Sequence, residues 1–415
     1  MGAGNWVLRV TPDENRRRVL AAGWWTEQAL GQRLAESLSA HRDLPFVVHS
    51  ATRPWRGTFG ELLDLSRRVA GGLSRLGVGV GDVVSFQTPN WIEGVATFYG
   101  AALLGAVAAP VVHFYGNREV SYILGQCEPR VHVTASWFGR QDFLANLASI
   151  PAPPTMEVVV GQDVPPGYSS FDELAAADPI TAAAPADPAS PALVKWTSGT
   201  TSKPKGVIHS HQTVGAEVQQ LGATSPPHDM PVLIANPISH AIGMLAGLVV
   251  PVDQGKPVHL LDLWDPNIVL DLMLGENLTT NGGATYFLIS LLDHPSFREE
   301  HLKNLPYQGM GGSPVPRAVT ERATALGINI YRMYGSTEHT SITGCTHVDA
   351  LEKRLGTDGR PLPGCEVSIG RPRWNRRCLR AGGRDPHSGP GVLLGLYRSR
   401  PHGQRVRCRR MVPNR

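Results

Sequence analysis

The regular alternation of strand-like and helix-like segments is the feature that most constrains the fold of this chain. Short runs of β-branched and apolar residues alternate with longer segments whose apolar positions recur every three to four residues. The predicted strands are 45–49, 83–86, 106–112, 131–134, 232–235, 257–261 and 328–332. The predicted helices are 26–41, 58–76, 90–105, a helix from Ser121, 242–249 and 268–274. This order indicates an α/β fold, with parallel sheets whose faces are covered by helices.

Local signals predict where some of these elements begin. Thr58 is followed three residues later by Glu61, which is the pattern of a capping box at a helix N-terminus. Asn90 is expected to cap the next helix. Residues 150–190 are rich in Pro, Ala and Asp and predict a surface connection. Because 415 residues exceed one typical domain, we expect two packed α/β subdomains joined near that connection.

Composition narrows the class of protein. No apolar run reaches the roughly 20 residues that a membrane-spanning helix needs. The first 25 residues lack the apolar core of a signal peptide, so we expect a cytoplasmic protein. The five cysteines are scattered and match neither a disulfide framework nor a zinc motif, which favours unpaired thiols.

A loop rich in hydroxyl groups is the strongest functional signal. It follows the apolar run that begins at Leu193 and contains no acidic residue. Its hydroxyls, its glycine and its lysines are Thr197, Ser198, Gly199, Thr200, Thr201, Lys203 and Lys205. Hydroxyls and exposed backbone N–H groups donate to phosphate oxygens, and a lysine adds positive charge. The spacing is not that of a Walker A loop. The alternative is an ordinary polar hairpin loop, but the absence of acids favours a phosphate loop.

Two later segments add to this signal. One is the glycine-rich run 309–314 and the other is Tyr331-Arg-Met-Tyr-Gly-Ser-Thr-Glu338. Taken alone, the second could be a helix N-terminus with Glu338 in its first turn. With the hydroxyl-rich loop, however, the three segments resemble the signature motifs of the adenylate-forming (AMP-binding) superfamily, and most closely its acyl-CoA synthetases. The resemblance covers about residues 25–367, and its departure is Ser202, where the family has glycine.

The resemblance implies ATP, Mg²⁺ and coenzyme A as cofactors and a small carboxylic acid, of the fatty-acid class, as substrate. The acid would be activated as an acyl-adenylate and then transferred to coenzyme A. The implied nucleotide-binding residues are Thr197, Ser198, Gly199, Thr200, Thr201, Lys203, Gly311, Gly312, Ser313, Tyr334, Gly335 and Ser336. The implied catalytic residues are Thr337, Glu338, His240 and Lys205. Mg²⁺ would bind Glu338 and Thr200, and the acid would contact His240, Met310 and Ile342. As a lone histidine near an apolar helix, His240 could instead be structural.

The last residues do not follow the family pattern. Residues 370–415 contain thirteen arginines and no lysine against one acid, Asp385, so this tail carries +12 and the remainder −8 of the net +4. We interpret residues 368–415 as a disordered, out-of-frame tail. Read one base later, Met411-Val412 must encode Trp, and permitted codons continue it as Tyr-Arg-Thr-Gly, a motif of the family.

Three readings of the whole chain follow. The first is a large N-terminal AMP-binding domain, residues 1–367, whose activity is impaired because the family's small C-terminal domain is absent. The second is an inactive remnant that still binds nucleotide or acid. The third is a nucleic-acid binder through the basic tail. Because the tail has neither lysine nor interleaved aromatic residues, we expect no nucleic-acid partner.

Overall fold

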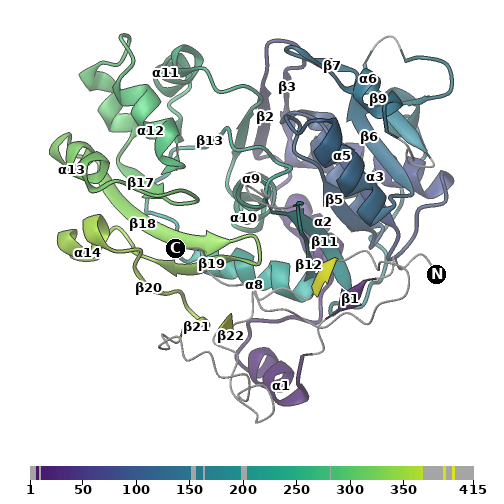
Figure 1. Ribbon diagram of the computed structural model, residues 1–415, viewed down its shortest axis with the longest axis horizontal. Coiled ribbons are helices and arrows are strands. Elements are labelled where there is room, and N and C mark those ends of the chain that lie inside the picture. Colours follow the sequence, from purple (N-terminus) through teal and green to yellow (C-terminus); the bar gives the residue numbers. More distant parts are fainter. Residues whose placement is uncertain are drawn as a thin grey trace.

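The structure is a computed structural model that describes residues 6–8, 11–150, 156–161, 164–197, 203–280, 282–367, 387–388 and 395–397. Three sheets of five or more strands organise these residues (Figure 1). Buried valines, leucines and phenylalanines of the strands and helices fill the cores between the layers. The predicted α/β class is confirmed.

The largest sheet has nine strands. In sheet order they are β1 (Val7–Leu8), β23 (Gly395–Tyr397), β12 (Gly206–Ser210), β11 (Pro191–Trp196), β5 (Val107–Pro110), β4 (Val83–Gln87), β6 (Val131–Ala135), β9 (Glu157–Val160) and β10 (Ser169–Ser170). The strands from β11 to β10 are parallel, whereas β12, β23 and β1 are antiparallel additions. Buried side chains of α5 (Asn117–Cys127) and α6 (Phe143–Ala148) form the core with one face of the sheet.

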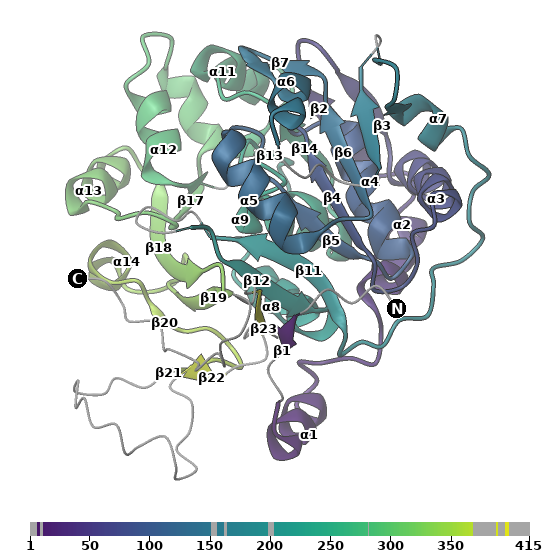
Figure 2. The same cartoon turned by 45° about the vertical axis from the view of Figure 1, so that its right-hand side comes forward.

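A second sheet shares its core with the first. Its strands, in order, are β15 (Thr279–Thr280), β13 (Val232–Ile234), β14 (Val258–Leu261), β2 (Pro45–His49) and β3 (Trp55–Thr58). Helices α2 (Leu30–Ala40), α3 (Phe59–Arg75) and α4 (Ile92–Leu103) join both sheets in one continuous apolar cluster. The two sheets are therefore packed through a common helical layer, as Figure 2 shows from a second side.

The third sheet was not predicted as a separate unit. Its strands are β16 (Gly282–Gly283), β17 (Tyr307–Met310), β18 (Asn329–Ser336), β19 (His339–Gly344) and β20 (Arg360–Pro361). Its apolar cluster is completed by α11 (Pro266–Gly275), α12 (Thr285–Leu292), α13 (Arg317–Ala325) and α14 (Leu351–Gly356). The β18–β19 end of this sheet reaches α8 (His211–Gly222) beside the first sheet (Figure 1).

The remaining elements are short. They are α1 (Asp13–Ala21), β7 (Trp137–Phe138), β8 (Gln141–Asp142), α7 (Phe171–Ala175), α9 (Ala241–Met244), the π-helical turn Leu245–Val249, α10 (Val250–Asp253), the 3₁₀ helix Glu299–Asn304, β21 (Glu366–Val367) and β22 (His387–Ser388). Of the predicted disordered tail, only β22 and β23 are described; both are paired, and the other residues lie outside the described part. The division at residue 367 stays a prediction.

Several local predictions can be scored. The strand at 45–49 is confirmed, and so is the capping box, in which Glu61 N donates to Thr58 Oγ1 (3.2 Å) and Thr58 N to Glu61 Oε2 (2.8 Å). The prediction that residues 150–190 are only a surface connection is wrong, because β9 inserts Val158, Val159 and Val160 into the first sheet. The helix expected from Ser121 begins four residues earlier.

Asn90 does not cap α4, whose N-cap residue is Trp91. The Asn90 amide instead joins the first two sheets. Its Nδ2 donates to the carbonyls of Asn236 (3.1 Å) and Leu261 (2.9 Å), and its Oδ1 accepts from Ile238 N (2.8 Å). This buried amide satisfies three backbone groups, one on β14 and two in the loop after β13, whereas a helix cap satisfies fewer.

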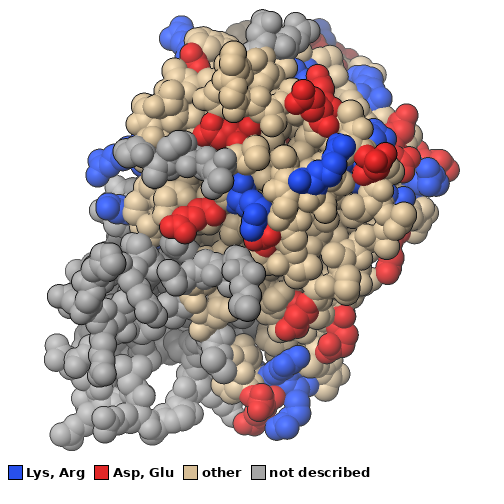
Figure 3. Space-filling model, turned by 90° about the vertical axis from the view of Figure 1, so that its right-hand side faces the viewer, with Lys and Arg blue, Asp and Glu red and all other residues tan. Residues whose placement is uncertain are grey.

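The described residues on the face shown in Figure 3 form no large patch of a single charge. There, acidic and basic side chains alternate among neutral residues over the described part of the chain. Among the described residues, no helix is both long and apolar enough to cross a bilayer.

Candidate functional site

A cavity of about 620 Å³ lies where the second and third sheets meet the C-terminal end of α8. Its walls come from β13, the start of β14, the loop that precedes α9, β16, the end of β17 and β18. In parallel sheets the C-terminal ends of strands converge on one edge, which is where α/β proteins place their binding sites. The size suits a small molecule.

A tight hairpin forms one rim of this cavity. Ser336 of β18 pairs with His339 of β19, so that Thr337 and Glu338 make a two-residue turn. The register shifts between Tyr334 and Ser336, which marks a bulge. The predicted strand at 328–332 therefore continues to Ser336, and the alternative of a helix N-terminus at Glu338 is wrong.

Gly335 makes the bulge possible. A Cβ atom at this position would lie 2.0 Å from the carbonyl oxygen of Thr340 on the facing strand. Only glycine permits so close an approach of two backbones. The glycine of the Tyr-Gly-Ser-Thr-Glu segment thus sets the direction in which the turn presents Thr337 and Glu338.

A buried ion pair anchors the hairpin from behind. Lys195 of β11 donates to Glu217 Oε2 on α8 (2.5 Å), and both side chains are at most 1% exposed. The second oxygen of Glu217 accepts from the backbone N–H of Thr340 (2.8 Å), and Lys195 also donates to Thr340 Oγ1 (3.2 Å). Burial alone would raise the pKa of Glu217, but the positive charge and the hydrogen bond of Lys195 outweigh burial and lower that pKa. The carboxylate is therefore held ionised.

A histidine supports the turn itself. Nε2 of His209, on β12, lies 3.1 Å from the carbonyl oxygen of Thr337. Since a carbonyl can only accept, Nε2 carries the proton. Burial lowers the pKa of His209 to about 3, so the ring is neutral at pH 7. The turn is thus hydrogen-bonded to the first sheet on its inner side.

Glu338 carries an unused acceptor. Its Oε1 is buried and has no hydrogen-bond partner within the described residues. An orphaned buried carboxylate oxygen is costly unless something else satisfies it. A hard divalent cation such as Mg²⁺ prefers oxygen ligands of this kind, so the turn fits the metal that the sequence predicted.

The hydroxyl-rich loop joins β11 to β12, and none of its described residues lines the cavity. Thr197 and Lys205 close it with two hydrogen bonds, from Thr197 N to Lys205 O (3.1 Å) and from Lys205 N to Thr197 Oγ1 (3.0 Å). The ammonium group of Lys203 lies 5.1 Å from the ring centroid of Tyr122 on α5. The predicted residues Ser198, Gly199, Thr200 and Thr201 lie outside the described part of the chain.

Glycines form the floor of the cavity next to the hairpin. The lining includes Gly282 and Gly283 of β16 together with Gly311 and Gly312, which follow β17. A Cβ at Gly282, which has φ +86°, would lie 2.3 Å from the carbonyl oxygen of Gly309. Tyr334 lies at the edge of this floor and is 53% exposed, so its ring is free to stack on a planar ligand.

His240 lines the cavity at the N-terminus of α9. Burial, and then the positive charge of Lys195, lower its pKa. The ring is therefore neutral at pH 7 and can donate one hydrogen bond without adding charge.

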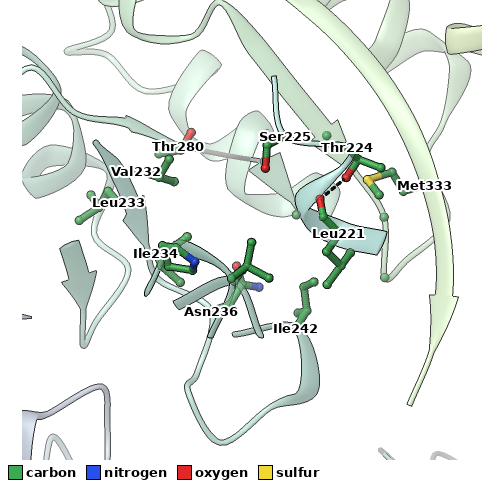
Figure 4. Close-up of a pocket in the computed structure, with 18 of the residues that line it drawn as sticks. Leu221, Thr224, Ser225, Val232, Leu233, Ile234, Asn236, Ile242, Thr280 and Met333 are labelled. Atoms are coloured by element: carbon green, nitrogen blue, oxygen red, sulfur yellow. Dashed lines mark hydrogen bonds between the residues drawn. The ribbon is translucent and has the colours of Figure 1, made fainter. Parts of the chain in front are cut away.

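A second part of the cavity wall is apolar. Its residues, labelled in Figure 4, come from α8, β13, α9 and β18, and they are Leu221, Val232, Ile234, Ile242 and Met333. We call this set the apolar lobe. Met333 also borders Gly311 of the glycine floor. The hydroxyl-bearing side chains of Thr224, Ser225 and Thr280 lie along its margin (Figure 4). The lobe can therefore take a hydrocarbon body with room for a polar substituent at its edge.

Comparison with known proteins identifies this arrangement. Residues 34–384 match the family described as AMP-binding enzyme. The chain belongs to the AMP-binding enzyme family. Two curated relatives of the chain are acid–CoA ligases.

These relatives have low sequence identity to the chain, but the matches cover most of it. The medium-chain fatty-acid–CoA ligase of Escherichia coli is 26% identical over 404 residues, which span 95% of this chain and 70% of the relative. The 3-[(3aS,4S,7aS)-7a-methyl-1,5-dioxo-octahydro-1H-inden-4-yl]propanoyl:CoA ligase of Rhodococcus jostii is 32% identical over 331 residues, 76% of this chain and 64% of the relative. The chain thus spans about two thirds of the length of these relatives.

A solved structure shows the same fold. The N-terminal domain of FACL13 from Mycobacterium tuberculosis superposes with a TM-score of 0.74 at 22% identity, covering 90% of this chain and 92% of that one. The expected recognition of an adenylate-forming enzyme body is confirmed by these matches.

The structure brings together many of the predicted site residues of this AMP-binding protein. Those that line the cavity are His240, Met310, Gly311, Gly312, Tyr334, Gly335, Ser336 and Thr337. The described site residues that are not among its lining residues are Thr197, Lys203, Lys205, Ser313, Glu338 and Ile342, although Glu338 completes the turn beside it. Their roles in binding or catalysis stay predictions.

Sequence reasoning missed the support of the hairpin. Lys195, Glu217 and His209 were assigned no role, yet they hold Thr337 and Thr340 in place. A signal was present, since Lys195 interrupts the apolar run Ala192-Leu-Val-Lys-Trp196 and a lysine inside a buried strand requires a partner.

Proposed function

We propose that this chain activates a carboxylic acid with ATP to give an acyl-adenylate, as the first half of an acid–CoA ligation. The observation that carries the proposal is one continuous cavity. Its glycine floor and the Thr337–Glu338 turn suit a nucleotide, and its apolar lobe suits the body of an acid. A site that joins both substrates in one cavity supplies the orientation that a two-substrate reaction needs.

In the proposed reaction, a carboxylate oxygen of the acid attacks the α-phosphorus of ATP. The bond between the α-phosphorus and its bridging oxygen breaks, and pyrophosphate leaves with the electron pair. Thr337 and the Thr197–Lys205 loop would hold the phosphates, with Lys203 and Lys205 adding positive charge. Neutral His240 would donate to the acid carboxylate and orient it.

Glu338 would hold Mg²⁺ through its orphaned oxygen, with Thr200 as a further proposed ligand. When bound, Mg²⁺ neutralises negative charge that builds on the phosphates. Tyr334 would stack on the adenine, and Gly311, Gly312, Ser313, Gly335 and Ser336 would bound the nucleotide. Coenzyme A would accept the acyl group in the second half of the reaction.

We further propose a compact acid, of medium chain length or with fused rings, as the substrate. The apolar lobe supports this, because it is bounded by Ile234, Ile242 and Met333 and has hydroxyl groups at its margin. The substrates named for two relatives, a medium-chain fatty acid and a bicyclic propanoate, are of this kind.

The test is acid-dependent pyrophosphate release by the full chain with ATP and Mg²⁺ over a panel of short, medium, long and bicyclic acids. Medium or bicyclic acids should give the highest kcat/KM. An Ile242→Trp variant should fill the lobe and raise KM for the acid while leaving KM for ATP within about twofold. If none of the acids stimulated pyrophosphate release, the proposed function would be wrong. If long-chain acids gave the highest kcat/KM, the proposed substrate class would be wrong.

A further inference from the structure

Two buried histidines and a carboxylate meet on the second sheet, outside the cavity. His49 ends β2, His259 lies in β14, and Glu276 follows α11. Nε2 of His49 is 3.0 Å from Nδ1 of His259, and Nδ1 of His259 is 3.9 Å from Glu276 Oε2. Nδ1 of His49 is 4.0 Å from Glu276 Oε1. One ligand atom of each residue lies within 4.8 Å of the others.

The strand register explains why these side chains converge. His259 pairs with Val47, which pairs in turn with Arg56 of β3, so these three residues lie on one face of the sheet. His49 is two residues beyond Val47 and shares that face, because side chains alternate along a strand. The end of α11 then brings Glu276 over the same face.

We propose that His49, His259 and Glu276 form a binding site for a divalent transition-metal cation of the Zn²⁺ type. Two imidazoles and one carboxylate are a donor set that Zn²⁺ accepts, with a fourth position left for water. Ligand atoms about 2.1 Å from a tetrahedral ion lie roughly 3.4 Å apart. The observed 3.0 and 3.9 Å separations bracket that value, so small side-chain rotations suffice.

The two histidine rings lie together in a buried position. The two rings are stacked, with centroids 5.3 Å apart, and their exposures are only 9% and 7%. The 3.0 Å contact between the rings is a hydrogen bond, so one of the two facing nitrogens carries a proton. A cation that binds both facing nitrogens would displace this proton.

Arg56 competes for the carboxylate. Its guanidinium binds both oxygens of Glu276, one at 3.2 Å and the other at shorter range. The Arg56 side chain is 61% exposed, so it can leave the carboxylate for water at little cost. Arg56 therefore weakens the cation site without blocking access to it. A bound cation would clamp β2, β14 and the end of α11, next to Val258, which lines the cavity.

The experiment titrates the full chain with Zn²⁺ by isothermal calorimetry, with equilibrium dialysis and metal analysis to count sites. His259→Gln should weaken this site at least about 100-fold, since it removes one of three ligands. Arg56→Gln should tighten it about fivefold, because a partly exposed ion pair of roughly 1 kcal/mol no longer competes. His294→Gln and Arg317→Gln are the matched controls and should leave the affinity unchanged.

The arginine variant guards against misfolding, because Arg56 is exposed and its removal takes away no metal ligand. The proposal is overturned if wild-type protein takes up no Zn²⁺. It is also overturned if His259→Gln binds as many ions as tightly as wild type, or if Arg56→Gln does not bind more tightly. No activity assay enters these comparisons, so the result is independent of the proposed function.

Discussion

At the scale of single residues, two features define the candidate site: a buried carboxylate oxygen without a hydrogen-bond partner in the described part of the chain, and a glycine whose surroundings leave no space for a side chain. Glu338 Oε1 has no hydrogen-bond donor among the residues that the structure describes, and Gly335 has no room for a side chain. The free acceptor of Glu338 allows the turn to bind a cation, and the close approach of the two strands at Gly335 orients the turn toward the cavity. Neither property depends on the bulk composition of the chain.

We predict that Gly335→Ala displaces the hairpin. The added Cβ would lie 2.0 Å from the carbonyl oxygen of Thr340, so one strand must move. A shift of about 1 Å at a positioned catalytic group costs on the order of 100-fold in rate. Pyrophosphate release should fall by about that factor in kcat/KM, while the far-ultraviolet circular dichroism stays that of wild type.

Gly125→Ala is the control for this substitution. Gly125 lies in α5, and a Cβ there meets nothing within 4 Å. Alanine should be neutral or stabilise the helix slightly. If Gly335→Ala retained wild-type activity, the proposed role of the bulge would be wrong.

The site residues that the sequence predicted best are those that lie close together in one continuous motif. Thr337 and Gly335 sit in a continuous motif and are found together at the cavity. The partner of Lys195 could not be read in this way, because Glu217 is 22 residues away on another element. Asn90 was predicted to be a helix cap, but its three backbone partners lie on β14 and in the loop after β13, which are distant in sequence.

At the scale of elements, the site is a junction of β11, α8 and the β18–β19 hairpin. The Lys195–Glu217 pair joins all three, since Glu217 also accepts from Thr340 N. A buried pair of this kind need not be more stabilising than an apolar pair, but losing one partner leaves an uncompensated charge. In this protein, the Lys195–Glu217 pair fixes the position of β19 relative to α8.

We therefore predict that Lys195→Met lowers the free energy of unfolding by about 3–5 kcal/mol, because Glu217 stays buried without its cation. Urea unfolding followed by tryptophan fluorescence measures this. The double variant Lys195→Met with Glu217→Leu should recover most of the stability but not the activity, since Thr340 N loses its acceptor. Full activity in the double variant would show that the pair has no positioning role.

Helices and strands were predicted correctly where the local sequence pattern was clear. They were missed where a segment is a strand only because it pairs with a strand distant in sequence. The α3 capping box is local and was predicted correctly. By contrast, β9 follows a Pro- and Ala-rich stretch and is a strand because it pairs with β6. The third sheet includes strands as short as two residues, such as β16, whose glycines carry no hydrophobic pattern.

At the scale of the whole molecule, buried neutral histidines couple folding to pH. Burial lowers the pKa of His132 and of His209 to about 3, and those of His113 and His211 to about 4. Between these values and the ordinary 6.5, the unfolded chain binds more protons than the folded one. Stability must therefore rise with pH across this window and fall on acidification.

We predict a steep loss of stability between pH 7 and pH 5. A histidine with a folded-state pKa near 3 contributes a loss of about 2 kcal/mol over that interval. Urea midpoints measured at half-unit steps should decrease steadily as the pH is lowered. In His132→Leu, proton uptake on unfolding at pH 5 should fall by about one proton. Midpoints that do not change between pH 7 and pH 5 would contradict the buried neutral state.

The central claim is that the Thr337–Glu338 turn and the cavity beside it form an ATP-dependent, acid-activating site. The most direct test is acid-dependent pyrophosphate release by the full chain, compared with Glu338→Gln and with Glu352→Gln at an exposed position on α14. Glu338→Gln should reduce the rate by at least about 100-fold, because the amide cannot hold the metal as a carboxylate does, and Glu352→Gln should match wild type. Wild-type rates in Glu338→Gln, in the presence of acid and Mg²⁺, would contradict the account.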